Sequence, residues 1–366
     1  MRRRFVIAWI VWMLLHFYAA VRLIPPLTLD SGGRALAWVI VAALCLAPLA
    51  ALVTIPERQI GRTVRWIGWT AMGLSTLIIV LLVITDLLFL RVWAVPGWIL
   101  SPVIIAAATI ATAVGAWRAR SPRVVRVTIP IASLPADLEG FRIVQLSDLH
   151  VGSTIRRHFV QEVVDAANGL SPDLVAFTGD VADGTVPGLT REVEPLALLE
   201  APYGKFFVAG NHEYYWDAIA WLAEIRRLGF SVLTNEHRLL ERGTGRLLLA
   251  GVTDVSASRR VPGHESDPGA ALAGAPPADV KILLAHQPRS AFAAQAAGFD
   301  LQLSGHTHGG QFPFNLLVRV GQPFVSGLHR LGALWVYVSQ GTGYWGPPLR
   351  LGAPPEITLI ELHAAS

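Results

Sequence analysis

The sequence predicts an α/β domain preceded by an all-α transmembrane segment of about four helices. Three observations lead to this prediction. The first 117 residues contain four long apolar stretches joined by short connections. From about Val124 onward, short β-branched segments alternate with amphipathic ones, as strands and helices do in an α/β domain. The 366-residue chain is also 53% hydrophobic, which is too apolar for an ordinary soluble protein.

The apolar stretches cover residues 5–24, 35–55, 66–90 and 98–117. Each is long enough to cross about 30 Å of hydrocarbon as a helix. One or two of them could be buried core helices instead, but four in succession argue against that for the whole set. We therefore predict a multi-pass membrane anchor at residues 1–120 and a separate domain at residues 121–366.

The distribution of arginines predicts the orientation of this anchor. One side of the predicted membrane carries Arg2, Arg3, Arg4, Arg58, Arg62, Arg65, Arg118, Arg120, Arg123 and Arg126. The other side carries only Arg34 and Arg91, with Arg22 near the end of the first stretch. Because short cytoplasmic segments carry the excess of basic residues, we expect both ends of the anchor on the cytoplasmic side. The C-terminal domain would then lie at the cytoplasmic face of the inner (cytoplasmic) membrane.

The segment Arg2-Arg3-Arg4-Phe5-Val6 supports a competing interpretation, because it loosely resembles a twin-arginine export signal. A signal peptide would be removed after one apolar stretch, whereas three more follow here.

The single cysteine, Cys45, excludes an intramolecular disulfide and a thiolate metal site. The absence of disulfides is compatible with the cytosol.

Charge is divided unevenly between the two parts of the chain. Residues 1–126 contain 13 basic and 3 acidic residues, a net charge of +10. Residues 127–366 contain 17 basic and 23 acidic residues, a net charge of −6. The basic character therefore belongs to the membrane-flanking part and not to the C-terminal domain. We expect no nucleic-acid partner, because such a partner would require a basic stripe on the folded domain.

In the C-terminal domain, five predicted strands each end in residues that can bind a metal ion. These strands are expected at 142–147, 173–178, 205–209, 281–285 and 301–304. The further elements expected are an edge strand at 125–131, helices at 156–170, 189–199 and 217–228, and strands at 246–252, 335–339 and 357–362. In sheets with βαβ crossovers, ligands bind beyond the carboxyl ends of the strands. Clusters that are far apart in sequence are therefore expected to meet at one edge of the sheet.

The residues that follow these strands form a mixed oxygen and nitrogen ligand set. It comprises Asp148, His150, Asp180, Asn211, His286, His306 and His308, with His212 beside Asn211. Such a set without sulfur suits Mn, Fe, Zn or Co better than Mg or Ca. Seven ligands are too many for one ion but enough for two if one carboxylate bridges. Two ions about 3.5–4 Å apart can clamp the attacking and leaving oxygens of a phosphoryl displacement and activate water.

Each cluster alone is a weak signal. Asp148 and Asp180 could be N-caps of helices that follow strands, and the histidines could be ordinary loop or turn residues. All of the clusters in this order, each after a predicted strand, form a strong signal. Glycines precede or follow most of them, as tight turns near an ion or a phosphate require.

At these motifs, the sequence resembles the calcineurin-like metallophosphoesterases. The resemblance extends from about residue 125 to residue 362 and rests on these motifs: Ser147-Asp148-Leu149-His150, Gly179-Asp180, Gly210-Asn211-His212-Glu213, His286 and Gly305-His306-Thr307-His308. The strings at 301–311 and 355–360 further resemble the bacterial YkuE/YaeI-like branch. The resemblance implies a four-layer α/β/β/α sandwich with two divalent metal ions. We expect Mn²⁺, with Fe, Zn or Co as alternatives.

The resemblance also implies a division of roles among the site residues. Asp148, His150 and His308 would hold one ion, Asn211, His286 and His306 would hold the other, and Asp180 would bridge them. His212 would be a catalytic residue and not a ligand, protonating the leaving oxygen or stabilising its charge. We expect Glu213 to orient His212 or a ligand. Asp183 is expected to be an ordinary loop residue.

The implied activity is hydrolysis of a phosphodiester or pyrophosphate bond by hydroxide activated between two metal ions. Members of the branch hydrolyse model phosphodiesters, and some relatives cleave the pyrophosphate of UDP-2,3-diacylglucosamine. With the lipid bilayer as a partner, a lipid-linked nucleotide of that kind is the substrate that we expect, or else a small phosphoester. The alternatives are a phosphomonoesterase, a cyclic-nucleotide phosphodiesterase, or a non-catalytic metal-binding membrane sensor.

Three further segments are candidates for contact with such a substrate. Residues 312–318 and 344–348 are apolar and could take up acyl chains, dip into the membrane surface or pack under the sandwich. Arg259-Arg260 could contact a substrate phosphate or belong to a solvated loop.

Overall fold

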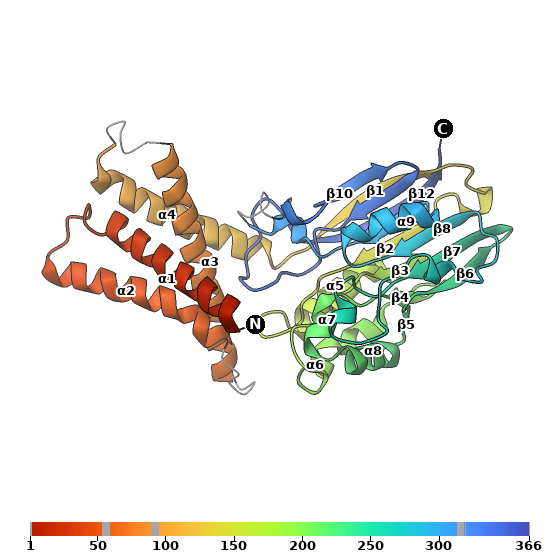
Figure 1. Ribbon diagram of the computed structural model, residues 1–366, viewed down its shortest axis with the longest axis horizontal. Coiled ribbons are helices and arrows are strands. Elements are labelled where there is room, and N and C mark those ends of the chain that lie inside the picture. Colours follow the sequence, from red (N-terminus) through yellow and green to blue (C-terminus); the bar gives the residue numbers. More distant parts are fainter. Residues whose placement is uncertain (1, 53–58, 89–94, 313–317, 319, 366) are drawn as a thin grey trace. The chain divides into compact units, whose positions relative to one another are not determined.

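The computed structural model describes residues 2–52, 59–88, 95–312, 318 and 320–365 (Figure 1). The chain forms two compact units, Met1–Arg118 with Gly346–Leu351, and Ala119–Trp345 with Gly352–Ser366. Part of the apolar segment predicted at 312–318 therefore lies outside the described residues, as do Arg58 and Arg91 of the predicted anchor loops.

The first unit contains four long helices. They are α1 (Arg2–Leu23), α2 (Ser31–Leu52), α3 (Gln59–Leu87) and α4 (Gly97–Arg118). All four are long and apolar enough to cross a membrane, as the sequence predicts. Only a small core forms between them, around Leu23, Leu82 and Ile104. Many of their large apolar side chains are instead exposed, which is typical of helices whose outer surface faces lipid.

Polar contacts tie the ends of two of these helices together. An Arg22 Nη2 group lies 2.6 Å from Asp86 Oδ1, and the Tyr18 hydroxyl donates to Asp86 Oδ2 at 2.5 Å. The carboxylate is thus neutralised inside the bundle, as an ionisable group in an apolar environment requires. The segment Gly346–Leu351 belongs to the same unit, and its Arg350 N–H donates to the Gly115 carbonyl at 3.0 Å.

The second unit is built on two six-stranded sheets (Figure 1). The first sheet has the order β1-β12-β2-β3-β4-β5, and the second has the order β10-β11-β9-β8-β7-β6. The strands of the first sheet are β1 (Arg123–Ile131), β2 (Arg142–Leu146), β3 (Leu174–Phe177), β4 (Lys205–Phe207), β5 (Ser231–Val232) and β12 (Glu356–Ala364). Those of the second are β6 (Glu236–Arg242), β7 (Gly245–Gly251), β8 (Val280–Leu284), β9 (Leu301–Ser304), β10 (Gly327–Leu331) and β11 (Leu334–Val338).

Helices cover the outer face of each sheet. The helices of this unit are α5 (Arg157–Gly169), α6 (Val186–Val193), α7 (Asn211–Trp216), α8 (Ala218–Arg227) and α9 (Ala291–Ala297). Strand residues alternate between two cores, because successive side chains of a strand point to opposite faces. In β2, for example, Ile143 packs between the sheets while Val144 packs among residues of α5 and α8. On the other side, residues of α9 pack with β8 and β11.

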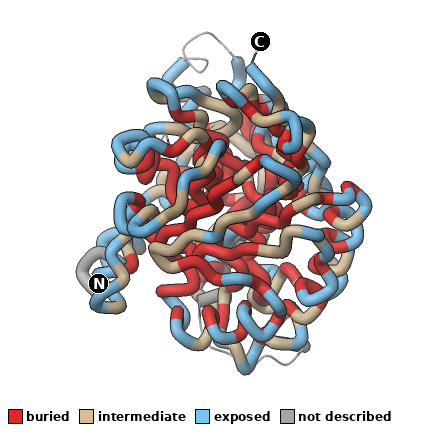
Figure 2. Tube along the Cα trace, turned by 90° about the vertical axis from the view of Figure 1, so that its right-hand side faces the viewer, coloured by how far each residue is buried: buried red, intermediate tan, exposed pale blue. Residues whose placement is uncertain are grey.

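These layers confirm the predicted α/β/β/α sandwich. Figure 2 shows buried residues running along the strands, with exposed residues on the surrounding helices and loops. The strands β2, β3, β4 and β5 are mutually parallel, as are β7, β8, β9 and β11. The carboxyl ends of several strands in each sheet therefore point the same way, which positions the residues that follow them.

Candidate metal centre

The sequence-predicted ligands lie at the carboxyl ends of strands from both sheets. Asp148 and His150 follow β2, Asp180 follows β3, and Asn211 and His212 begin α7 just after β4. From the second sheet, His286 follows β8, whereas His306 and His308 follow β9. All of these residues are buried except His306, which is partly exposed. The two sheets thus bring residues from five strand ends into one place.

One group of ligand atoms comes from Asp148, His150 and His308. The Nε2 atoms of the two histidines are 3.0 Å apart, and His308 Nε2 lies 3.5 Å from Asp148 Oδ1. Ligands that share one ion at metal–ligand distances of about 2.0–2.2 Å lie about 3 Å from one another. The three side chains therefore have a spacing suitable for a single ion.

A second group comes from Asp180, His286 and His306. His286 Nε2 lies 3.2 Å from each of Asp180 Oδ2, His306 Nδ1 and Asn211 Oδ1. This group also has the spacing of ligands around one ion.

The Asp180 carboxylate lies between the two groups. Its Oδ2 atom is 3.2 Å from His286 Nε2 in the second group and 3.9 Å from His150 Nε2 in the first. The same oxygen lies 4.0 Å from His212 Nε2. A carboxylate in this position can be shared by two ions, as the ligand count requires.

The backbone is held in an unusual conformation at five of the proposed ligands. The φ angles are 52° at Asp148, 52° at His150, 58° at Asp180, 72° at His306 and 52° at His308. Left-handed backbone is uncommon for residues with a Cβ atom. Residues in such strained conformations cluster at functional sites, where the surrounding structure holds them in place. The backbone thus indicates a site independently of the side-chain distances.

Hydrogen bonds fix the orientation of the ligand side chains. Asp148 accepts from the His306 N–H at 2.9 and 3.0 Å and from the Ser147 hydroxyl at 2.6 Å. His286 Nδ1 lies 2.7 Å from the Thr178 carbonyl, which can only accept. The Nδ1–H of His286 therefore donates to this carbonyl, and the Nε2 lone pair is left for a metal ion.

Glu213 holds two of the ligand loops together. Its carboxylate accepts from the backbone N–H groups of Gly210 at 2.7 Å, Asp180 at 2.9 Å and Val181 at 2.8 Å. Burial and the charge of Asp180 raise the pKa of this carboxyl to about 7, although the three donors oppose the rise. Glu213 therefore positions the backbone of Asp180 and the turn before Asn211.

Asp183 is not an ordinary loop residue, and the sequence-based expectation for it is wrong. Its carboxylate is hydrogen-bonded to His212 Nδ1 and lies 3.2 Å from His150 Nδ1. The bridge between Val151 and Ala182 brings this carboxylate beside the two rings. The sequence feature that could have predicted this role is the position of Asp183, three residues after Asp180 in the same short loop.

The carboxylates around His212 favour its protonated form. Burial opposes the charged imidazolium, but the charge of Asp180 and the hydrogen bond and charge of Asp183 outweigh it and raise the pKa to about 9. Burial likewise opposes a charged Asp183, yet His150 and His212 hold the pKa of that carboxyl well below its usual value. His212 can therefore carry a proton at neutral pH.

Metal binding is expected to weaken as the pH falls. Burial opposes a charged His286, but the charge of Asp180 and its hydrogen bond raise the pKa of this imidazole. Below that pKa an incoming ion must displace the proton, so affinity should fall by about tenfold per pH unit for each proton released. Calorimetric titration with Mn²⁺ at neutral and mildly acidic pH measures this change. An affinity independent of pH would contradict it.

Gly305→Ala is expected to disturb the site without changing the sheets. A Cβ atom at Gly305 would collide with the Ser147 hydroxyl and the Asp148 carboxylate. Forcing a methyl group into such a space costs about 1–3 kcal/mol and would displace Asp148 from its ligand position. Metal content and thermal unfolding measure the effect. Gly169→Ala is the matched control, because a Cβ atom there meets nothing within 4 Å. Equal metal content in both variants would contradict the prediction.

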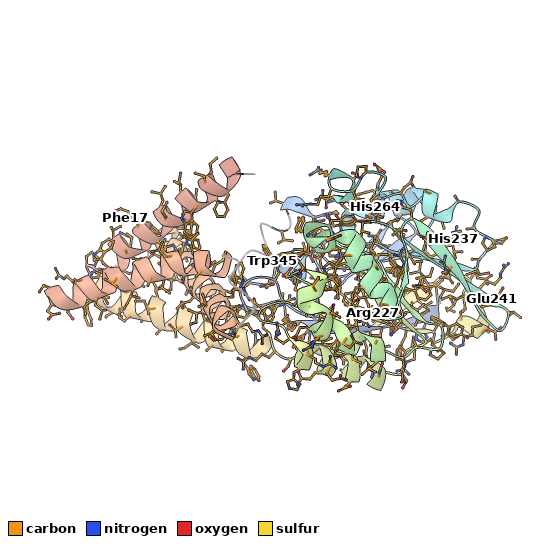
Figure 3. All side chains as sticks on the ribbon, turned by 90° about the horizontal axis from the view of Figure 1, so that it is seen from below. Phe17, Arg227, His237, Glu241, His264 and Trp345 are labelled. Carbon is orange, nitrogen blue, oxygen red and sulfur yellow. The ribbon has the colours of Figure 1, made fainter. Side chains whose placement is uncertain are left out.

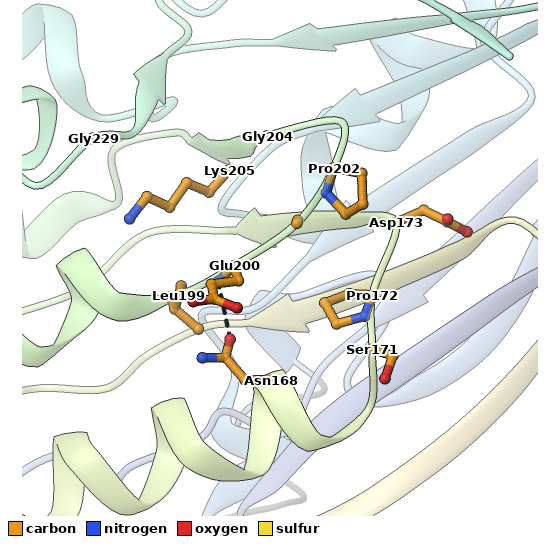
Figure 4. Close-up of a pocket in the computed structure, with 11 residues that line it drawn as sticks. Asn168, Ser171, Pro172, Asp173, Leu199, Glu200, Pro202, Gly204, Lys205 and Gly229 are labelled. Carbon is orange, nitrogen blue, oxygen red and sulfur yellow. Dashed lines mark hydrogen bonds between the residues drawn. The ribbon is translucent and has the colours of Figure 1, made fainter.

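A cavity elsewhere in this unit is separate from the candidate metal centre (Figure 4). It has a volume of about 690 Å³, and Asp173 and Gly204 place it at the amino ends of β3 and β4. Asp180 and Asn211 follow the opposite ends of the same strands. The Lys205 ammonium donates to the carbonyls of Leu196 and Ala197. None of the predicted ligands lines this cavity.

The fold and the candidate ligand clusters are consistent with the comparisons to known proteins. The family model of the calcineurin-like phosphoesterases matches residues 141–310, a range that contains every predicted ligand. An Aquifex aeolicus protein named as an uncharacterized metallophosphoesterase is 34% identical over 244 residues, covering 66% of this chain and 91% of its own. The Bacillus subtilis metallophosphoesterase YkuE is 32% identical over 249 residues, covering 65% of this chain and 85% of its own.

The chain belongs to the calcineurin-like metallophosphoesterase family, whose members use divalent metal ions. The predicted resemblance to YkuE is thereby confirmed. A zebrafish protein named as a transmembrane protein with a metallophosphoesterase domain is also similar, with 41% identity over 256 residues. That alignment covers 68% of this chain but only 59% of the zebrafish protein, and a bovine relative of the same name is covered over 58%.

Proposed function

We propose that this protein is a membrane-bound hydrolase that cleaves a phosphodiester or pyrophosphate bond with two divalent metal ions. The position of the Asp180 carboxylate between two groups of ligand atoms carries the proposal. Asp148, His150 and His308 would hold one ion, and Asn211, His286 and His306 the other. When bound, such a pair supplies Lewis acidity and lowers the pKa of water. The oxygen and nitrogen donor set supports Mn²⁺, with Fe, Zn or Co as alternatives.

In this proposal His212 is the proton donor to the leaving oxygen. Asp183 holds its Nδ1 side, while Nε2 is directed toward Asp180 at 4.0 Å. A protonated imidazole in this position can transfer its proton as the phosphorus–oxygen bond breaks, and it can stabilise the developing negative charge. Asp183 would act as a positioning residue, because it holds the ring and favours its charged form.

We further propose that residues 1–120 are the anchor and residues 121–366 the catalytic domain, at the cytoplasmic face of the inner membrane. Four apolar helices and the arginine distribution support this orientation. A reporter that is active only in the periplasm should stay inactive when it is fused to the C-terminus. A reporter that matures only in the cytoplasm should be active at the same position, and the reverse pair of results would overturn the orientation.

A membrane-derived substrate is proposed because the domain is joined to helices that lie in the bilayer. UDP-2,3-diacylglucosamine is the lipid-linked nucleotide that we would test first. The purified full-length protein with Mn²⁺ should hydrolyse bis-p-nitrophenyl phosphate and this lipid, and chelation should stop both reactions. Faster hydrolysis of phosphomonoesters or of cyclic AMP would instead assign one of the alternative activities. No hydrolysis of any of these substrates by metal-loaded protein would overturn the proposed activity.

A further inference from the structure

Two aromatic side chains lie beside the His212 ring. The ring centroid of Tyr215 lies 5.0 Å from that of His212, and the ring centroid of Trp345 lies 5.9 Å from it. Tyr215 is 49% exposed and Trp345 is 53% exposed, whereas His212 is buried. Large aromatic side chains that are half exposed beside a buried polar cluster are available to bind another molecule.

The position of Trp345 is linked to the metal-ligand loop. Gln311, three residues after His308, donates from Nε2 to the Trp345 carbonyl at 2.8 Å. It also accepts from the Trp345 N–H through Oε1 at 3.0 Å. This pair of hydrogen bonds holds the backbone that carries the indole. A ring supported in this way has the pre-organisation that a binding site requires.

A cationic side chain also contacts Tyr215. The Arg260 Cζ atom is 4.5 Å from the centroid of the Tyr215 ring, so Arg260 and His212 contact the same ring. Among the residues that the structure describes, no carboxylate is paired with Arg260. Its planar guanidinium is exposed and can bind a phosphate through two N–H groups.

The loop that carries Arg260 is held in place through His264, which is labelled in Figure 3. The Thr253 hydroxyl donates to the His264 carbonyl at 3.0 Å, and the Tyr214 hydroxyl lies 2.8 Å from His264 Nδ1. Tyr214 precedes Tyr215 in α7. The helix α7 therefore both carries the Tyr215 ring and contacts the loop of Arg260 through Tyr214. Arg260 is thus attached to the same framework as the catalytic histidine.

We propose that Tyr215, Trp345 and Arg260 form the binding subsite for the leaving group, and that this group carries a planar ring and a second phosphate. The inference rests on the proposed function, because it requires His212 to face the leaving oxygen. Water forms the new phosphorus–oxygen bond and releases one proton to solvent, the bond to the leaving group breaks, and the leaving oxygen takes the proton of His212, which is then restored from solvent. The ring stacks on the exposed indole, and Arg260 neutralises the phosphate that is not attacked.

Kinetics with two substrates tests the subsite. UDP-N-acetylglucosamine offers a planar base and a second phosphate, whereas bis-p-nitrophenyl phosphate offers a ring without a second phosphate. For Arg260→Gln, the ratio of kcat/KM for the first substrate to that for the second should fall by about ten- to hundredfold. Trp345→Ala should lower kcat/KM for both substrates by about tenfold, and Trp345→Phe should restore most of the loss.

Arg259→Gln is the matched control, because Arg259 is the exposed neighbour in the same loop and should leave the ratio unchanged. Metal content and thermal unfolding show whether each variant is folded. If the wild type hydrolyses both substrates and Arg260→Gln keeps the wild-type ratio, the subsite is wrong and the proposed function stands. If the metal-loaded wild type hydrolyses neither substrate nor any other phosphoester, the proposed function itself fails.

Discussion

Asp180→Asn is expected to lower kcat/KM by about 10³-fold or more and to reduce the bound metal below two ions per chain. The carboxylate lies within 4.0 Å of nitrogens of His150, His212 and His286, so it contacts both ligand groups. An amide keeps the shape but loses the negative charge and one of the two oxygens that would bridge. Elemental analysis of the purified protein and hydrolysis of bis-p-nitrophenyl phosphate measure the two effects.

Asp165→Asn is the control for this substitution. The same aspartate-to-asparagine substitution is made here at an exposed position of α5. The Asp165 carboxylate accepts only from Gln161 among the hydrogen bonds of the described residues. This variant should keep wild-type metal content and activity. The bridging assignment would have to be abandoned if Asp180→Asn retained two ions and wild-type kcat.

His212→Ala is expected to lower kcat by about 10²–10⁴-fold while leaving the metal content unchanged. The reason is that His212 would donate a proton without holding an ion. The loss should be smaller for substrates with a p-nitrophenolate leaving group, because that group leaves readily without protonation. Loss of an ion from the variant would instead make His212 a ligand.

Asp183→Asn tests how Asp183 affects His212 while His212 itself is still present. The charge and hydrogen bond of Asp183 help to raise the pKa of His212, so their removal lowers it. A proton donor loses activity as the pH rises through its pKa. The decline in kcat on the alkaline side should therefore begin at lower pH in this variant than in the wild type. An unchanged pH profile with reduced kcat would show a structural role only.

The strand ends that form the site are the part of the fold that the sequence predicts best. The buried runs before Asp148, Asp180 and His286 are short, β-branched and followed directly by polar residues, and the structure places β2, β3 and β8 there. Both the strand and the polar residues that follow it can be recognised from a few neighbouring residues in the sequence. The meeting of the clusters follows from the parallel order of the strands, which the alternation of strands and helices predicts.

Elements whose stability depends on distant partners could not be predicted in the same way. The strand β6 carries charged residues along much of its length and is formed by antiparallel pairing with β7. The helix α7 begins within the Gly-Asn-His-Glu motif, because the Glu213 carboxylate accepts from the Gly210 N–H. The contacts of Asp183 depend on how two loops pair, which its own sequence neighbours do not reveal.

The apolar segment at 344–348 illustrates the same limit within adjacent residues. Tyr344 is buried in a hydrophobic cluster, whereas Trp345 is half exposed beside His212. Tyr344 therefore packs into the domain, which is one of the alternatives that the sequence leaves open, whereas Trp345 does not. Composition shows that a segment is apolar, but the direction of each side chain depends on the turn that the backbone makes.

The left-handed backbone at five of the proposed ligands has a consequence for the evolution of this domain. Glycine or asparagine at those positions would relax the chain, so conformational preference alone favours loss of the aspartates and histidines. Selection for the proposed metal-dependent activity would oppose that drift. In a descendant that no longer needs catalysis, these residues should disappear sooner than the buried strands around them. In this proposal, intact residues at these positions in a relative are a sensitive record of retained activity, and a preserved sandwich is not.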